Sequence, residues 1–474
     1  MELHINLVGR KNLSGEIYRQ IRRAIADGRL RPGDCLPASR DLARSLQVSR
    51  TTVTVAYDRL AGEGFLTSRI GAGTFVGDHF APSRARSRSV PTEGVLHPRP
   101  LWDSIKLSHA FAKPAEFDFR TGLPDASLFP HEAWRRLLNR ELRAQVASAA
   151  VYDESGGHRG LREAIARHAG VSRGLQVSPG DVTITNGAQQ ALDLIGRALV
   201  APGDRVAVED PGYAPPRYLF SSLGARVQGV PVDDEGIVVD AIARDTRLVY
   251  VTPSHQYPLS VTMSLPRRLA LLEWAARNNA AIIEDDYDSE FRFDERPLEP
   301  LQTLDTSGRV VYVGSFSKTL LPALRLGFLV TPGCCTAAVH KAKYVSDWHT
   351  STLIQAVLAR FIDDGGFARH LRKVGRVYAE RRALIANILK RDLAEHLMIV
   401  PSVAGLHITT LARKASTEQI NAAFDCAAEQ GIQLQRLAKF YFEQPARAGL
   451  LFGYGAIPTA NIPQALRKLR SCFG

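Results

Sequence analysis

The chain has 474 residues, of which 45% are hydrophobic and 23% are charged. These are ordinary values for globular proteins, and a chain of this length is expected to fold into two or three domains with large buried cores. No apolar run is long enough to span a membrane, and the N-terminus lacks the layout of a signal peptide, so we expect a cytoplasmic protein without a membrane partner.

The net charge of +12 is concentrated near the N-terminus. Residues 1–100 contain 16 Lys and Arg against 9 Asp and Glu, a net of +7, whereas the other 374 residues have a net of only +5. This distribution is typical of a nucleic-acid-binding module attached to a nearly neutral body. A basic surface that only keeps the protein soluble is the alternative that charge alone leaves open.

The five cysteines are odd in number and show neither a C-x-x-C pair nor the spacing of zinc ligands. This pattern argues against a disulfide framework or a structural metal, and we expect the cysteines to be reduced, buried or incidental.

The first elements predict a helix-turn-helix. Ile17, Ile21 and Ile25 recur at every fourth position, which indicates an amphipathic helix. Ser39 and Ser49 are suited to cap two further short helices that are joined by a tight turn. Two apolar runs, 64–69 and 73–76, follow as a β-hairpin around a glycine-rich turn, which would form a wing.

Arg50 and Thr51 face away from the apolar side of the third helix, near the end that enters the major groove in this motif. By themselves they are more often solvated helix residues, but the complete order of helix, turn, helix and hairpin favours DNA contact. The segment resembles the winged helix of GntR-type bacterial regulators in the motifs LPASRDLA (36–43), VSRTTV (48–53), YDRL (57–60) and GAGTFV (71–76). The resemblance implies that the DNA-binding residues are Arg40, Ser49, Arg50, Thr51, Arg69 and Gly73.

We therefore expect a winged helix over residues 10–77. Residues 78–100 are rich in Pro, Ser and Arg and poor in apolar residues, which predicts a flexible basic linker. Besides tethering, this linker could touch DNA phosphates. The rest of the chain, 101–474, is expected to form an effector domain.

In the effector domain, apolar runs alternate with helical segments. The runs lie at 181–185, 205–209, 247–252, 280–284 and 310–313. Runs without polar alternation suit strands that are covered on both faces, so we expect an α/β domain with a mostly parallel sheet. Long helical patterns and short strands from about residue 350 predict a smaller C-terminal α/β subdomain.

The last of these strands ends in Gly314-Ser-Phe-Ser-Lys318. Small hydroxyl residues and a lysine at a strand end are suited to hold a phosphate and a carbonyl cofactor, with Ser315 and Ser317 on the phosphate and Lys318 as the Schiff-base amine. This pattern predicts a pyridoxal-phosphate site.

Other strand ends supply the remaining groups that such a cofactor needs. The amides of Ala188 and Gln189 open a helix where a phosphate is favoured. A carboxylate and a phenol follow the fourth run as Asp285-Asp-Tyr287, suited to a pyridinium nitrogen and a phenolic oxygen. Tyr213 is placed to stack on an aromatic ring, and Arg325 is suited to bind phosphate through two hydrogen bonds.

Residues from about 117 to 470 resemble fold-type I aminotransferases, above all in the lysine motif 314–325. The resemblance implies that Lys318 binds pyridoxal phosphate, that Asp285 pairs with its ring nitrogen and that Tyr287 bonds its phenolic oxygen. It further implies that Tyr213 stacks on the ring, that the phosphate is held by Ser315 and Arg325, and that Tyr152 reaches the phosphate in the partner subunit of a homodimer. The order of the two domains is similar to that of the MocR-type subgroup of GntR regulators.

Two positions differ from the aminotransferase pattern. Tyr257 stands where these enzymes have an asparagine that tunes the ring oxygen, and Leu451 stands where an arginine clamps the substrate carboxylate. Arg217, Arg436 and Arg447 are possible substitutes. Without such a clamp, binding of an amine survives more easily than turnover.

The prediction is thus a pyridoxal-phosphate-dependent transcription regulator that binds double-stranded promoter DNA. It would sense a small amine, an amino acid or pyridoxal phosphate itself through Schiff-base exchange at Lys318. The alternative is an active aminotransferase with an accessory DNA-binding domain. A cofactor-free scaffold is disfavoured because Lys318, Asp285 and Arg325 are all present.

Overall fold

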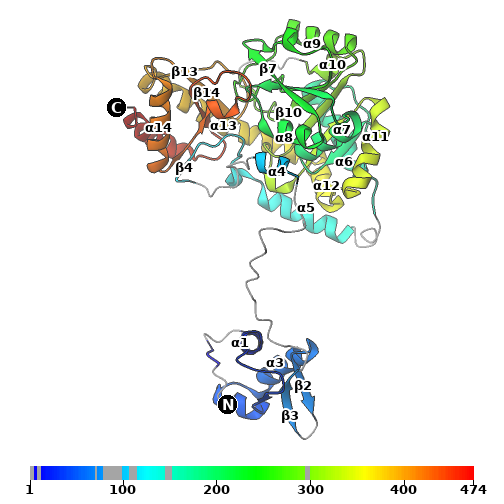
Figure 1. Ribbon diagram of the computed structural model, residues 1–474, viewed down its shortest axis with the longest axis vertical. Helices are drawn as coiled ribbons and strands as arrows, with labels where there is room; N and C mark the ends of the chain where they lie inside the picture. The colour runs from blue at the N-terminus through cyan, green and yellow to red at the C-terminus, as the bar shows by residue number, and fades with distance from the viewer. Residues whose placement is uncertain are drawn as a thin grey trace. The chain divides into compact units, whose positions relative to one another are not determined.

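The computed structural model describes residues 5–7, 12–69, 72–77, 99–105, 115–144, 152–293 and 299–473 (Figure 1). The chain divides into two compact units, residues 1–102 and 103–474, and the short helix α4 (Leu101–Ser104) lies at their boundary. Residues 70–71 of the predicted hairpin turn and 78–98 of the predicted linker lie outside the described residues.

The first unit is a winged helix. Its elements are α1 (Leu13–Ala26), β1 (Cys35–Leu36), α2 (Ser39–Ser45), α3 (Arg50–Gly62), β2 (Leu66–Arg69) and β3 (Gly73–Val76). The three strands form an antiparallel sheet in the order β1-β3-β2, and the predicted isoleucine stripe of α1 is buried against α3. The predicted helix-turn-helix and wing are confirmed.

The two predicted caps of these helices have different outcomes. Ser49 caps α3, because its side-chain oxygen accepts a hydrogen bond from the backbone N–H of Thr52 (3.1 Å). The prediction for Ser39 is wrong: α2 begins at Ser39 itself, and Ala38 occupies the cap position. The Ser39 hydroxyl instead accepts a hydrogen bond from Arg50 Nε (3.4 Å), across the turn between the two helices.

The second unit is built on an eight-stranded sheet. In sheet order the strands are β5 (Val182–Thr185), β12 (Gly327–Val330), β11 (Val310–Ser315), β10 (Ala281–Asp286), β9 (Thr246–Val251), β6 (Arg205–Asp210), β7 (Arg226–Asp233) and β8 (Gly236–Ile237). The run from β11 to β7 is parallel, whereas β12 is antiparallel to both of its neighbours and β8 is antiparallel to β7. The predicted mixed, mostly parallel sheet is confirmed.

Helices cover both faces of this sheet, because successive side chains of a strand point to opposite sides. Val206 and Val208 pack with α7 (Ala188–Leu199), α8 (Ala214–Ser222) and α11 (Gly333–Asp347) on one face. Ala207 packs on the other face, where α9 (Leu265–Arg277) and α10 (Leu301–Leu304) lie. Beneath β5 and β12, that second face is covered by α5 (His131–Ala144), α6 (Arg159–Arg173) and α12 (Thr352–Asp363).

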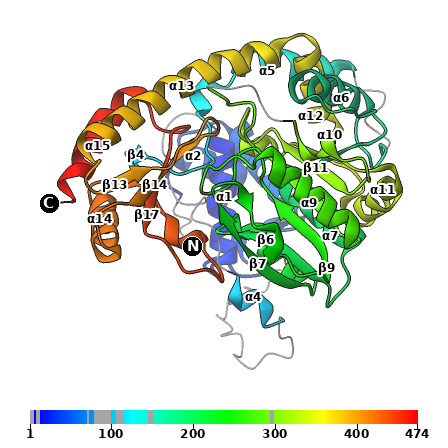
Figure 2. The ribbon, with the colours of Figure 1, turned by 90° about the horizontal axis from the view of Figure 1, so that it is seen from above.

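A smaller layer packs at the side of the large sheet. It holds an antiparallel sheet in the order β13 (Leu397–Ile399), β14 (His407–Ala412), β17 (Gly449–Gly453) and β16 (Gln435–Arg436). The long helix α13 (Gly366–Asp392) runs from α12 toward α14 (Thr417–Glu429) and α15 (Ile462–Ser471), as Figure 2 shows. The early strand β4 (Phe117–Asp118) pairs with β15 (Ile432–Gln433), so the start of the unit is tied to its end.

One expectation about cysteine is wrong. Cys426 in α14 and Cys472, directly after α15, form a disulfide with their Cα atoms 5.8 Å apart. The packing of α14 against α15 brings together two residues that are 46 positions apart, and no spacing pattern in the sequence indicates this pair. Among the described residues, no helix is both long enough and apolar enough to cross a membrane.

Candidate functional sites

The first candidate site is the N-terminal end of α3. Ser49, Arg50 and Thr51 are exposed there, and the contact between Arg50 and Ser39 brings the N-terminal ends of α2 and α3 side by side. Arg40, the next residue of α2, is exposed as well. Cationic and hydroxyl groups at two helix N-termini match what phosphates and base edges require.

The second part of this surface is the wing. Arg69 and Gly73 face each other across the β2–β3 pair, and the Arg69 guanidinium lies over the Phe75 ring at 5.1 Å. Gly73 has φ +119, which side-chain-bearing residues rarely adopt, so glycine is required there. All six predicted DNA-binding residues are thus exposed on the first unit.

The second unit contains a cavity of about 290 Å³. It is lined by nine of the ten residues predicted to bind the cofactor: Ala188, Gln189, Tyr213, Asp285, Tyr287, Ser315, Ser317, Lys318 and Arg325. The tenth, Tyr152, lies on the surface with 75% of its area exposed and packs against Trp348 at a ring distance of 4.4 Å. The cavity forms where the carboxyl ends of the parallel strands meet at one edge of the sheet.

Lys318 projects its amine into this cavity. Nζ donates a hydrogen bond to the backbone oxygen of Gly122 (2.7 Å), and burial lowers the pKa of the amine. A lowered pKa increases the fraction of the neutral amine, which is the form that attacks a carbonyl carbon.

The surroundings of the Asp285 carboxylate suit a cationic partner. Its side chain is 4% exposed, Oδ2 accepts a hydrogen bond from the Tyr250 hydroxyl (2.7 Å), and Oδ1 is buried without a partner. Burial raises the pKa of this carboxyl to about 6, although the bond from Tyr250 opposes the shift. A protonated ring nitrogen would satisfy Oδ1 and neutralise the charge.

The opposite end of the cavity is suited to an anion. Ala188 and Gln189 are the first residues of α7, whose N-terminus carries a partial positive charge. Arg325 lies beside them and donates from Nη2 to the backbone oxygen of Asn186 (2.7 Å). Gly187 allows this approach, because a Cβ at that position would lie 2.9 Å from Arg325 Nη2. Ser315 completes the group, and its Oγ accepts from the backbone N–H of Ser317 (3.1 Å).

Three tyrosines line the space between these ends. The Tyr257 ring lies edge-on to Tyr213 at 5.9 Å and to Tyr287 at 6.1 Å. Tyr213 is 41% exposed, but desolvation of its hydroxyl and the nearby Asp285 carboxylate raise the pKa of Tyr213 to about 12, so the hydroxyl stays protonated at neutral pH. The Tyr287 hydroxyl donates to the backbone oxygen of His255 (2.9 Å).

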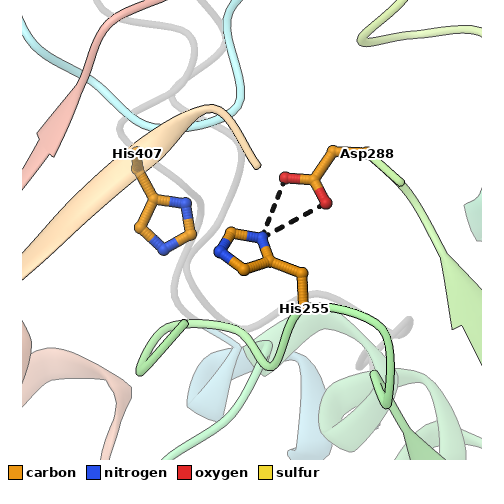
Figure 3. A group of neighbouring side chains, drawn as sticks. All are labelled: His255, Asp288 and His407. Carbon is orange, nitrogen blue, oxygen red and sulfur yellow. Dashed lines mark hydrogen bonds and ion pairs between the residues drawn. The ribbon is translucent and has the colours of Figure 1, made fainter. Parts of the chain in front are cut away.

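The sequence interpretation missed a buried cluster behind Tyr287. In Figure 3 the His255 ring lies between Asp288 and His407, and its Nδ1 is 3.1 and 3.2 Å from the two carboxylate oxygens of Asp288. In the described part of the chain, these residues form the one group of three His, Cys, Asp or Glu side chains whose metal-ligating atoms all lie within 4.8 Å of one another. Hydrogen bonds account for the arrangement, since Asp288 accepts from His255 Nδ1, and His407 Nε2 lies 3.2 Å from the Pro258 oxygen.

The sequence interpretation also missed the wall opposite the sheet. Arg120, Thr121, His407 and Gln435 line the cavity, yet they come from loops and short strands of the smaller layer and its border. The available signal was the run Asp118-Phe-Arg-Thr-Gly122, in which polar residues follow a short apolar strand.

Leu451 does not act on the cavity as a charged clamp. It is fully buried in β17 and packs with Leu259, Leu411, Leu437 and Phe440. The three possible substitutes, Arg217, Arg436 and Arg447, are absent from the described lining of the cavity. Arg217 instead lies over the Phe442 ring, at 4.3 Å.

Comparison with known proteins gives two family matches. The family "Aminotransferase class I and II" matches residues 119–469, and the family "Bacterial regulatory proteins, gntR family" matches residues 13–76. The probable rhizopine catabolism regulatory protein MocR of Rhizobium meliloti is 36% identical over 97% of this chain and 93% of its own length. The pyridoxine biosynthesis transcriptional regulator PdxR of Corynebacterium glutamicum is 32% identical over 93% of this chain and 91% of its own length.

Solved structures match the second unit. The kynurenine aminotransferase of Pyrococcus horikoshii has a TM-score of 0.71 at 26% identity, covering 79% of this chain and 96% of that protein. The α-aminoadipate aminotransferase LysN of Thermus thermophilus has a TM-score of 0.68 at 30% identity, covering 75% of this chain and 92% of that protein.

The fold and the comparisons define a DNA-binding transcription regulator whose second unit has the fold-type I aminotransferase architecture, from a family that binds pyridoxal phosphate. The chain belongs to the MocR subgroup of the GntR family of bacterial regulators.

Proposed function

We propose that this regulator binds pyridoxal phosphate at Lys318 and that an amine, or the cofactor itself, changes its binding to promoter DNA. When bound, pyridoxal phosphate supplies an aldehyde that forms an imine with a primary amine and absorbs visible light. The observation that carries the proposal is the unpartnered Oδ1 of Asp285, buried in the same cavity as the Lys318 amine.

Each residue of the cavity would contact a different part of the cofactor. Asp285 would hold a proton on the ring nitrogen, while Tyr213 would cover the face of the ring. Arg325, Ser315 and the N-terminus of α7 would neutralise and orient the phosphate. Tyr287 would donate to the phenolic oxygen after exchanging its present bond to His255.

We further propose that the regulator is a homodimer in which Tyr152 reaches the phosphate site of the partner subunit. The support is an aromatic surface on the second unit, where Tyr152, Tyr344 and Trp348 are 75%, 53% and 44% exposed. Tyr344 and Trp348 are stacked at 5.3 Å. Exposed aromatic side chains grouped in this way are typical of protein interfaces. Sedimentation of the wild type and of Trp348→Ala tests this, with dissociation expected for the variant.

On the DNA side, we propose that Arg50 and Thr51 contact bases in the major groove. Arg40, Ser49, Arg69 and Gly73 would contact the backbone or the neighbouring groove. Two winged helices of a dimer would bind paired half-sites in promoter DNA.

The decisive experiment measures promoter binding by wild type and Lys318→Ala, each with and without pyridoxal phosphate. Wild type is expected to change its affinity on addition of the cofactor, whereas Lys318→Ala should not change. Lys318→Arg is a matched control, because it keeps a positive charge but has no primary amine. Equal affinity in all conditions would refute the coupling.

The second candidate function is transamination, and the retained pair of Lys318 and Asp285 favours it. Prolonged incubation of the holoprotein with amino donors and a keto acid distinguishes a transaminating enzyme from a sensor. Repeated turnover would favour an enzyme, whereas a single colour change without cycling would favour a sensor. The uncharged Leu451 position leads us to expect the second result.

A further inference from the structure

One wall of the cavity is not used by the residues assigned to the cofactor. It is formed by Thr121, Tyr257, His407 and Gln435, together with the apolar Leu123 and Leu406. The wall lies beside the reactive amine, because Lys318 Nζ donates to the backbone oxygen of Gly122, the residue next to Thr121. The body of any amine that replaces Lys318 would therefore lie against this wall.

The wall offers no positive charge for a carboxylate. In the described lining, the permanently or potentially cationic side chains are Lys318, Arg325 and Arg120, besides the neutral His407. Lys318 and Arg325 are assigned to the cofactor. Arg120 is 5% exposed and its guanidinium is bound to Asp118, with Nε at 2.9 and 3.1 Å from the two carboxylate oxygens. A carboxylate on the wall would be desolvated without a counter-ion of its own, which is strongly unfavourable.

The directions of the hydrogen bonds show what the wall can accept. The backbone N–H of Thr121 lies 3.3 Å from the Gln435 side-chain atom Oε1, and because an N–H only donates, that atom is the amide oxygen. The Thr121 hydroxyl must therefore also donate to Gln435 Oε1. The Tyr257 hydroxyl, 2.7 Å from Thr121 Oγ1, must then donate to Thr121. The Tyr257 oxygen keeps only the ability to accept.

His407 has the same character. Its Nε2 lies 3.2 Å from both the backbone oxygen of Pro258 and the hydroxyl oxygen of Ser260. The carbonyl oxygen only accepts and the hydroxyl can accept, so both contacts are satisfied when Nε2 carries the proton. Burial lowers the pKa of this imidazole to about 3, so the ring is neutral and Nδ1 is an acceptor. The wall thus combines acceptors at Tyr257 and His407 with the N–H donors of the Gln435 amide and contains no cation. Such a neutral set suits hydroxyl groups, which both donate and accept, better than a carboxylate without a counter-ion.

From this geometry we propose that the effector is a primary amine whose other polar groups are hydroxyls, an amino alcohol or amino polyol, and not an amino acid. This inference rests on the proposed function, because it requires the effector to replace Lys318 as the amine bound to the cofactor. It names the chemical class of ligand that the wall selects.

The test uses pairs of amines that differ only in the group that would meet the wall. 3-Aminopropan-1-ol is compared with β-alanine, and 2-aminopropane-1,3-diol with serine, by titrating the visible absorbance of the full-length holoprotein. We expect the alcohol of each pair to bind at least about tenfold more tightly, which corresponds to about 1.4 kcal/mol.

One variant adds a positive charge to the neutral wall and leaves the residues assigned to the cofactor unchanged. Gln435→Arg adds a cation next to Thr121 and should shift the preference toward β-alanine and serine. Gln435→Glu is the matched control, because its carboxylate oxygen can still accept from Thr121 and it adds no cation, so it should keep the preference for alcohols. The unchanged absorbance of each holoprotein before titration shows that both variants fold and bind the cofactor.

The outcomes separate this inference from the function on which it rests. Amines that bind with the acid preferred, or with no preference, would overturn the effector class while leaving the proposed function intact. A wild-type protein that shows no absorbance of a bound cofactor would overturn both. Preference for alcohols in wild type and Gln435→Glu, together with its loss in Gln435→Arg, supports the proposal.

Discussion

Replacing Asp285 by asparagine should stabilise the cofactor-free second unit, although it removes a residue of the cavity. The substitution preserves shape: the asparagine oxygen can accept from Tyr250, and its nitrogen takes the place of Oδ1, which has no partner in the wild type. What is lost is a buried negative charge. The loss of stability caused by this buried charge follows from the pKa of Asp285, which burial raises from 3.8 to about 6.

The size and sign of the effect follow from proton linkage. A pKa raised in the folded state means that the folded protein holds the proton more tightly than the unfolded chain. Above pH 6 the carboxyl is ionised in both states, and folding bears the full cost of about 3 kcal/mol, since each pKa unit is worth 1.36 kcal/mol. The cost falls as the pH drops from about 6 to 3.8 and vanishes below 3.8, where the carboxyl is protonated in both states. The free energy of unfolding of Asp285→Asn should therefore exceed that of wild type by up to about 3 kcal/mol at pH 8, and the difference should disappear below about pH 3.

Urea unfolding followed by tryptophan fluorescence measures this difference in the second unit, because residues 13–76 contain no tryptophan. Tyr250→Phe is the matched control of opposite sign: without its hydroxyl the ionised carboxylate loses a stabilising bond, and stability at pH 8 should fall. Added pyridoxal phosphate should stabilise wild type more than Asp285→Asn. A variant that is equally or less stable than wild type at pH 8, without cofactor, would refute the reasoning about the buried charge.

Three further predictions concern cofactor and DNA binding. The affinity of wild type for pyridoxal phosphate should fall as the pH drops through about 6, because protonation removes the charge of Asp285; a spectrophotometric titration should find a flatter profile for Asp285→Asn. Arg50→Ala should weaken promoter binding about tenfold or more in an electrophoretic mobility assay and leave the absorbance of the bound cofactor unchanged; loss of both would indicate general unfolding instead. Leu60→Ala should destabilise the winged helix by about 2–5 kcal/mol, because Leu60 is fully buried, and should abolish promoter binding. Tryptophan-monitored unfolding of the second unit should stay the same for Leu60→Ala, and a shift there would contradict the independence of the two cores.

Apart from the local error at Ser39, most of the missed and corrected residues depend on contacts between positions that lie far apart along the chain. Thr121 and Gln435 are 314 positions apart, and Cys426 and Cys472 are 46 apart. The sequence also does not indicate that β12 is antiparallel, or that Leu451 is buried in an apolar cluster and not turned toward the cavity. Such facts depend on how the smaller layer packs against the large sheet.

The sequence by itself determined the winged helix, the α/β unit and most of the cofactor cavity. It did so because periodicity, caps and strand ends are local, and because the carboxyl ends of parallel strands meet at one edge, so Lys318 and Asp285, at the carboxyl ends of β11 and β10, had to converge. Arg325 reaches the same edge just before the antiparallel strand β12. Only the tertiary structure decided the wall beside Lys318. Its acceptors, its lack of a free cation in the described lining and the pairing of Arg120 with Asp118 arise from side-chain contacts between distant segments, and no local pattern encodes the direction of a hydrogen bond.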